Sequence, residues 1–235
     1  MYSRELEGET FTFGVSGKLW KNALVMYDRQ TKSLWSHMTG ECLQGHYKGK
    51  KLEMQAAVPI VRWGVWWAAH PETKVLTIEG REDQRRDNYR SYHSSSDTGL
   101  FPPEHRDKRL GRKDLVFGVA LGEHQKAYSL QEKLWETDRS GSWRLIQDAI
   151  GEVPVVVYHD PGNFSSTVYR RKVGENVIRF AGPAEGVMAI DTDRRSWNLL
   201  TGIGSDGAIL EAVPHLNIYW FAWIDFYPEA ILYAE

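Results

Sequence analysis

Short stretches in which apolar and polar residues alternate make up much of the chain and predict β-strands. Aromatic and β-branched side chains are frequent in these stretches, and turn-forming residues separate them. The run VPVVVY differs, because it is almost continuously apolar and is closed by Asp160, Pro161 and Gly162, which is typical of a buried strand. Strands are expected over residues 9–14, 23–28, 33–39, 51–58, 116–121, 125–130 and 153–158, and a helical turn is expected over residues 131–136.

Two segments instead follow the helical period. In residues 60–70, tryptophans fall at i, i+3 and i+4 on one face of a helix, and Pro71 ends the segment. A later segment repeats this pattern and ends at Pro228. We expect both tryptophan faces to pack in the core, although they could instead line an aromatic pocket for an apolar ligand or cradle a cation. The tryptophans are Trp63, Trp66 and Trp67 in the first segment and Trp220 and Trp223 in the second.

Three sequence blocks occur twice in the same order, which indicates a duplicated domain. YSRELEGETFTF at residues 2–13 matches YRRKVGENVIRF at residues 169–180 without a gap. DRQTKSLWSHMTG, which begins at Asp28, matches DTDRRSWNLLTG, which begins at Asp191, and WGVWWAAHPETKVL matches WFAWIDFYPEAILY. The blocks recur after roughly 160 residues, which is too long for a solenoid repeat and suits a repeated domain.

The predicted fold class is therefore α+β, with two tandem, structurally similar halves of mainly antiparallel sheet and short Trp-rich helices. Residues 1–78 are expected to form the first repeat and residues 115–235 the second, joined by an irregular polar connection at residues 79–114. The first repeat lacks the strand that precedes the second, because the sequence begins at the equivalent of Val168. We expect that the natural protein is longer, or else that a partner covers this edge, for example in a homo-oligomer that pairs through the exposed edge of the first repeat.

Composition and charge narrow the classes of function. Of 235 residues, 29 are basic and 31 acidic, and the net charge of -2 leaves no basic excess for binding nucleic acid. No apolar run approaches the roughly 18 residues that span a membrane. The polar N-terminus does not resemble a secretory signal, so the chain as it stands is expected in the cytoplasm and would be exported only if a natural N-terminal segment is missing. One cysteine excludes an internal disulfide and a multi-cysteine zinc site.

That cysteine is the leading candidate for chemistry. Cys42 lies in the Gly-bounded loop TGECLQGHYKG, and a thiolate there could act as a nucleophile or as a soft metal ligand. His37 and His46 flank it, so the three side chains could converge as a copper or zinc site. The alternative is a small buried residue between two surface histidines.

Other candidates have an equally simple structural explanation. Asp28 could act as a general base, but an Asp at the start of a turn most often caps its own backbone. The segment REDQRRDNYR could clamp an anionic ligand through its arginines, or its mixed charges could form a solvated loop. The sequence contains no phosphate loop, Rossmann glycine motif, nucleophile elbow or HExxH motif. The candidate ligand-binding residues are Trp35, Arg29, Tyr89 and Arg85.

Three stretches of the chain form a recognisable pattern: VSGKLWKNALVMYDRQTKSLWSHMTGECLQG, then GKKLE and the HPETKVL of the first tryptophan segment, and the ending VPH..YWFAWIDFYP. This pattern resembles a known prokaryotic family, number 3179 among the domains of unknown function. The family brings no established activity. Its fuller members begin with a strand that ends in a cysteine-bearing motif just upstream of the position of Tyr2, and some carry selenocysteine there, which implies redox or metal chemistry. The equivalent stretch of the second repeat has His159 and no cysteine.

Three hypotheses about function follow. The first is a redox- or metal-associated protein with its site near the Cys42 loop, possessing a copper or zinc ion. The second is a non-catalytic domain that binds a ligand, either a small molecule or a protein partner. The third is a cofactor-independent enzyme of unknown reaction.

Overall fold

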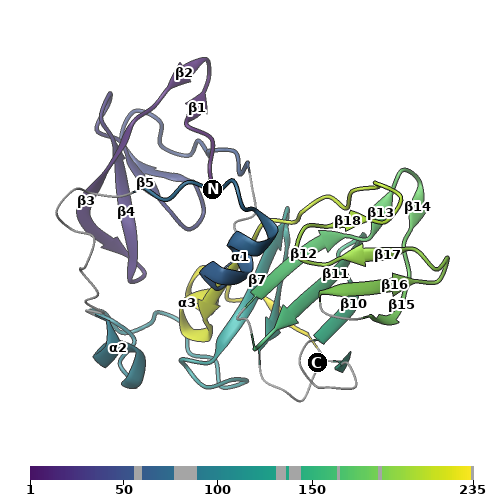
Figure 1. Ribbon diagram of the computed structural model, residues 1–235. Helices are drawn as coiled ribbons and strands as arrows, with labels where there is room; N and C mark the ends of the chain where they lie inside the picture. Colours follow the sequence, from purple (N-terminus) through teal and green to yellow (C-terminus); the bar gives the residue numbers. More distant parts are fainter. Residues whose placement is uncertain are drawn as a thin grey trace.

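A small β unit forms the first part of the chain (purple, Figure 1). The computed structural model describes residues 1–55, 60–76, 89–130, 136–137, 144–162, 165–184 and 187–233. In the first part, a hairpin precedes a four-stranded antiparallel sheet of order β3-β4-β5-β6. Lys21 and Asn22 join β3 to β4 with φ of 53° and 60°, the left-handed pair that a two-residue hairpin turn requires. The strands are β1 (Glu5–Leu6), β2 (Glu9–Thr10), β3 (Phe13–Trp20), β4 (Ala23–Asp28), β5 (Leu34–Ser36) and β6 (Cys42–Gln44).

The rest of the chain builds a larger β unit (teal, green and yellow, Figure 1). Its four-stranded sheets have the orders β19-β7-β8-β20, β12-β11-β10-β9 and β15-β16-β17-β18, and all pairs except the parallel pair β20 and β8 are antiparallel. The strands are β7 (Leu115–Leu121), β8 (His124–Ser129), β9 (Glu136–Thr137), β10 (Arg144–Ile150), β11 (Val153–Asp160), β12 (Ser165–Arg170), β13 (Lys172–Val173), β14 (Asn176–Val177), β15 (Phe180–Pro183), β16 (Met188–Asp191), β17 (Ser196–Asn198), β18 (Ile203–Gly204), β19 (His215–Tyr219) and β20 (Ile231–Leu232).

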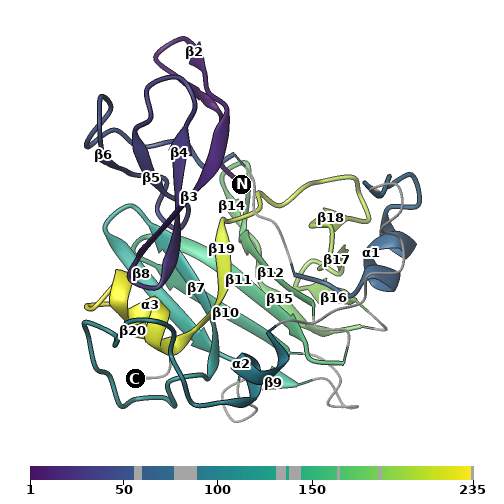
Figure 2. The same cartoon turned by 90° about the vertical axis from the view of Figure 1, so that its left-hand side faces the viewer.

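Three short helices lie in the described part of the chain. Figure 2 shows α1 and α3 on opposite sides of the sheets of the larger unit, with the first unit above α3. Trp20 of the first unit packs edge-on against Phe226 at the end of α3, with ring centroids 5.2 Å apart. The helices are α1 (Trp63–Ala69), α2 (Arg90–Ser94) and α3 (Trp220–Phe226).

The expected α+β class is confirmed in its coarse form, because the protein is mostly antiparallel sheet with few short helices. Strands lie where residues 23–28, 116–121, 125–130 and 153–158 predicted them. The predicted strand at 9–14 is divided between β2 and the start of β3, and within 33–39 the strand is limited to β5. The strand β10 and most strands after β11 were not predicted. The division into a first repeat, a connection and a second repeat stays a prediction. Residues 79–88 of the connection lie outside the described residues, and the part from residue 89 to residue 114 contains only α2.

One local prediction is wrong, and another is left untested. Within the described residues of 51–58, the chain makes isolated bridges from Lys51 to Glu41 and from Met54 to Tyr2 and forms no strand. The expected helical turn at residues 131–136 lies mostly outside the described residues, and its last residue belongs to β9.

The tryptophan faces of the two helices have opposite environments. Trp220 and Trp223 of α3 are buried, as predicted, in a cluster with the hairpin of β7 and β8. The same prediction for α1 is wrong, because Trp63 and Trp67 are each 53% exposed and none of its residues is buried. The helical pattern is correct in both cases, but in the described part of the chain no sheet covers α1.

Candidate functional site

Cys42, the leading candidate from the sequence, lies in the core of the first unit. It begins β6, is 1% exposed and packs with Trp35 and Leu52. Its Sγ donates a hydrogen bond to the carbonyl oxygen of Gln44 over 3.5 Å. Burial raises the pKa of the Cys42 thiol, and the nearby Asp28 carboxylate raises it further, so the thiol is stabilised in its protonated, weakly nucleophilic form.

The two histidines that flank Cys42 do not join it in a ligand set. His37 is half-buried, and its Nδ1 donates to the carbonyl oxygen of Leu24 over 2.7 Å. His46 is exposed, and its ring packs edge-on against Tyr47 with centroids 4.7 Å apart. Among the residues that the structure describes, no three His, Cys, Asp or Glu side chains gather closely enough to hold a metal ion. The predicted convergence of Cys42, His37 and His46 is therefore absent from this structure.

Asp28 and Trp35 bind each other at the turn after β4. Trp35 Nε1 donates to Asp28 Oδ2 over 2.9 Å, and the backbone N–H and the hydroxyl of Thr31 donate to Oδ1. Burial favours the protonated carboxyl, but these hydrogen bonds outweigh it and hold the pKa of Asp28 below its usual value. Asp28 thus caps its own turn, which is the simpler of its two interpretations.

The larger unit contains the same pair of groups. Asp191 is the last residue of β16, as Asp28 is the last residue of β4, and Trp197 Nε1 donates to Asp191 Oδ2 over 2.9 Å. Both carboxylates and both indoles are buried. A contact that recurs in both units is explained by packing, so it gives no reason to assign Asp28 a catalytic role.

The remaining candidates are dispersed. Arg29 is exposed and donates to the Tyr27 hydroxyl over 3.1 Å, and Tyr89 is exposed near His93. Arg85 lies outside the described residues. The structure therefore does not bring the four proposed ligand-binding residues into one site.

A cavity of ≈ 340 Å³ lies between the two units, and the sequence did not point to it. Its size is in the range of small-molecule sites. Segments from the start, the middle and the end of the chain form its walls. The residues that the following argument uses are Tyr2, Met38, Leu52 and Met54 from the first unit and Gly118, His215, Leu216, Trp223 and Tyr227 from the second.

His215 lines this cavity and contains a neutral acceptor. It is 9% exposed, and its ring stacks on Phe117 with centroids 4.4 Å apart. Its Nδ1 donates to the carbonyl oxygen of Val213 over 2.8 Å, which leaves the lone pair on Nε2. Burial lowers the pKa of His215 to about 4, so the ring is neutral at pH 7, and Nε2 is buried without a partner in the described part of the chain.

Trp223 lines the same cavity and contains an unpaired donor. Its Nε1 is buried and, within the described residues, has no hydrogen-bond partner. The helix α1 contains a natural comparison, because there Trp66 Nε1 donates to Thr73 Oγ1 over 2.9 Å. In the sequence alignment of the two helices, Thr73 corresponds to Ala230, which has no acceptor. A buried polar group without a partner costs about 1–3 kcal/mol, so each such group in a native structure needs an explanation.

Two tyrosines complete a neutral wall. The hydroxyl of Tyr2 donates to the carbonyl oxygen of Met38 over 2.6 Å. Burial and the proximity of Tyr227 raise the pKa of Tyr2, and burial raises the pKa of Tyr227. The ring of Tyr227 packs on Trp223 with centroids 4.5 Å apart. The buried walls of the cavity are therefore largely apolar and uncharged, and the charged side chains of its lining, Lys51 and Glu53, are exposed.

The sequence contained part of this site. The motif VPH included His215, and Trp223 was assigned to the core, where it does lie. The substitution of Ala230 for Thr73 between the repeated blocks was the available signal, because it removes the partner of a buried indole. The cavity itself could not be predicted, since its walls come from segments far apart in the sequence.

The fold and the cavity define a mostly antiparallel α+β protein with a largely apolar cavity between two β units. The chain belongs to the family described as protein of unknown function (DUF3179), whose model matches residues 1–230. This confirms the resemblance found in the sequence. No curated protein and no solved structure matches the chain. Within the described residues, the helices are all too short or too polar to cross a membrane.

Proposed function

We propose that this protein binds an uncharged small molecule in the cavity between its two β units. The observation that carries the proposal is that two residues lining one cavity, His215 and Trp223, each contain a buried polar atom, Nε2 and Nε1, with no partner among the described residues. Together they offer one acceptor and one donor. This is the ligand-binding hypothesis from the sequence, now tied to a particular place.

The walls restrict the chemistry of the ligand. A hydroxyl or amide group could donate to His215 and accept from Trp223, and an apolar part of the molecule could pack on Leu52 and Leu216. Lys51 and Glu53 also line the cavity, but both are exposed. A charged group placed beside the buried His215 and Trp223 would lose its hydration without gaining an opposite charge from these two residues. We therefore expect alcohols, phenols or amides to bind in preference to carboxylates or amines.

Benzyl alcohol is a suitable probe, with toluene as the control that lacks the hydroxyl and benzylamine as the charged control. We expect benzyl alcohol to raise the Tm and to shift the indole N–H resonance of Trp223 in ¹⁵N-labelled protein, assigned with Trp223→Phe. Toluene and benzylamine should bind more weakly. Equal binding of toluene, or a resonance that does not move, would contradict the proposal.

Ala230 offers a matched pair of variants. Ala230→Thr restores the acceptor that Thr73 supplies in α1, so the threonine hydroxyl should accept a hydrogen bond from Trp223 Nε1. The affinity for benzyl alcohol should then fall by about tenfold, which corresponds to the loss of one hydrogen bond. Ala230→Val adds the same volume without an acceptor and measures the effect of crowding alone. Should both variants fold poorly, His215→Leu tests the acceptor independently.

The redox or metal role of the Cys42 loop stays a hypothesis with less support. The thiol is buried and stabilised in its protonated form, and His37 is engaged with Leu24. Metal analysis of the purified protein, with Cys42→Ser as the control, tests it directly.

We also infer that the two β units contain copies of one repeated unit, as the sequence blocks suggest. The paired Asp and Trp contacts at Asp28 and Asp191 support this inference. A second pair does too, because Tyr169 donates to the Leu200 carbonyl oxygen over 2.8 Å as Tyr2 donates to that of Met38. Each of these tyrosines also lies against a left-handed glycine, Gly202 and Gly40 respectively.

A further inference from the structure

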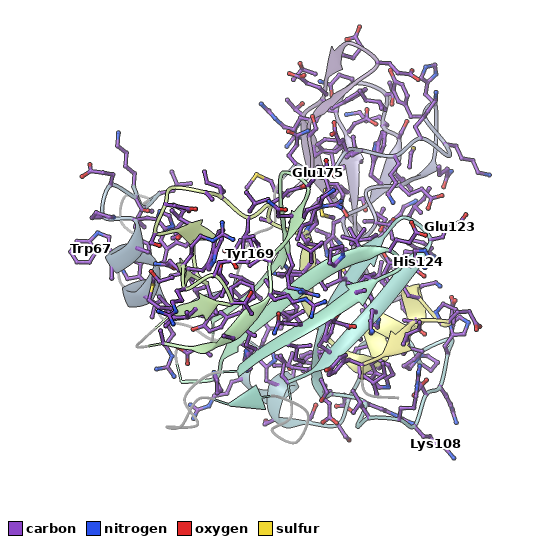
Figure 3. All side chains as sticks on the ribbon, turned by 90° about the vertical axis from the view of Figure 1, so that its right-hand side faces the viewer. Trp67, Lys108, Glu123, His124, Tyr169 and Glu175 are labelled. Carbon is purple, nitrogen blue, oxygen red and sulfur yellow. The ribbon has the colours of Figure 1, made fainter. Side chains whose placement is uncertain are left out.

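The helix α1 presents an apolar face to solvent. Trp63 and Trp67 are each 53% exposed, and in the extended segment that follows Val75 is 61% and Leu76 93% exposed. Figure 3 shows Trp67 pointing away from the body of the protein. We call these four residues the α1 face. Large exposed apolar patches on a monomer mark interaction sites.

At the helix α3, three residues equivalent to those of the α1 face are buried against a β-hairpin. Trp220, Ile224 and Leu232, which align with Trp63, Trp67 and Val75, are 1%, 2% and 5% exposed. They pack on the hairpin of β7 and β8. The strand before α3, β19, pairs with one edge of this hairpin, and β20 after α3 pairs with the other edge.

The backbone on either side of α1 has nearly the same conformation as the backbone on either side of α3, where the flanking segments enclose the hairpin of β7 and β8. Arg62 before α1 has φ and ψ of -64° and 139°, and Tyr219 before α3 has -69° and 143°. After the helices, His70 has -137° and 70° and Tyr227 has -135° and 74°. In the described residues from 60 to 76, however, the segments that flank α1 form no strand.

The contact inside the second unit also specifies the partner. A Cβ on Gly118 of β7 would lie 2.4 Å from the ring of Trp223, so only glycine fits beneath this indole. Trp66 is the equivalent of Trp223 in α1. A strand that lies across α1 must therefore carry glycine opposite Trp66, with apolar residues such as Val116 and Ala127 at the neighbouring positions.

We propose that residues 60–76 clasp an antiparallel β-hairpin of a partner polypeptide, apolar on one face and with glycine opposite Trp66. The hairpin would lie between two flanking segments as β7 and β8 lie between β19 and β20. The same hairpin of a second copy of this chain is not the occupant, because both of its edges are already paired.

The test uses the full chain and a cyclised, fluorescently labelled peptide with the sequence of residues 114–130. We expect saturable one-to-one binding that Trp63→Ser/Trp67→Ser weakens by at least about tenfold. Val15→Ser, which changes an equally exposed apolar residue elsewhere, should leave the affinity unchanged. A peptide with valine in place of the Gly118 equivalent should not bind.

Three results would overturn the proposal. The first is a free peptide that shows no saturable binding, together with a tethered peptide that does not protect residues 60–76 from hydrogen exchange. The tethered form is the same peptide joined to the chain through a flexible linker. The second is binding that the double variant does not change, which would place the peptide on the second unit. The third is a dimer in light scattering that the double variant abolishes, which would make a second copy the occupant.

Discussion

His215 is a histidine that its surroundings hold neutral. The bond from Nδ1 to Val213 fixes the tautomer, the stack on Phe117 fixes the ring, and burial opposes a positive charge. These constraints are useful for recognition, because they orient a lone pair before any ligand arrives. Preorganised groups lose little entropy on binding.

The depressed pKa of His215 predicts a loss of stability in acid. The His215 ring titrates at about pH 4 in the folded protein and near pH 6.5 in the unfolded chain. Between these pH values only the unfolded state binds the proton. The free energy of unfolding should fall through this window by up to about 3 kcal/mol and should not change through this group above pH 6.5. Urea denaturation of wild type and His215→Gln at pH 7 and pH 4 measures the effect. If the difference between the two proteins is the same at both pH values, the assignment of a buried neutral His215 is wrong.

At the scale of elements, the close approach of β7 to α3 fixes one wall of the cavity. The absence of a side chain at Gly118 lets the Trp223 ring lie against the strand. A strand residue without a side chain costs conformational entropy, and here close packing of an aromatic ring offsets that cost.

Gly118→Ala should therefore destabilise the protein by about 1–3 kcal/mol, as overpacked substitutions do, and should displace Trp223. Gly122→Asn in the turn after β7 is the control. Its φ of 57° is one that Asn tolerates, and no atom lies within 4 Å of an added Cβ, so its effect should stay below about 0.5 kcal/mol. Thermal unfolding and the assigned indole N–H resonance of Trp223 follow both variants. A Gly118→Ala protein as stable as wild type would show that α3 can move away from the strand.

The sequence predicted elements better than it predicted their surroundings. Alternation located the hairpin of β7 and β8, and the tryptophan spacing with a following proline located both α1 and α3. Burial of α1 was predicted wrongly, because periodicity identifies an apolar face but not what covers it. The predicted metal site around Cys42 is absent for a related reason, since His37 and His46 are near Cys42 in the sequence but each makes another contact.

At the scale of the whole molecule, the hydrophobic core is divided. The first unit has one small buried cluster around Trp35, Cys42 and Leu52, and the larger clusters all lie in the second unit. A small cluster buries less apolar surface and gives a less stable unit. We therefore expect the first unit to open before the second.

Asp28→Ala tests this order of opening. It leaves the buried Trp35 N–H without its acceptor and should cost the first unit about 1–3 kcal/mol. In hydrogen exchange followed by mass spectrometry, protection should fall over β3 to β6 and persist in β10 to β12. Asp191→Ala, the matched change in the second unit, should affect β15 to β18 instead. Equal loss of protection throughout the chain after Asp28→Ala would mean that the two units unfold together.

The burial of Cys42 has a practical consequence. Because the chain's one thiol is 1% exposed, maleimide reagents should leave the native protein largely unlabelled, and the natural cysteine can remain in place. Cysteines introduced at Glu7 and at Glu175, both on exposed turns, could then carry a pair of spin labels, one on each β unit. Distances between such labels would report whether the two units draw together when a guest fills the space between them.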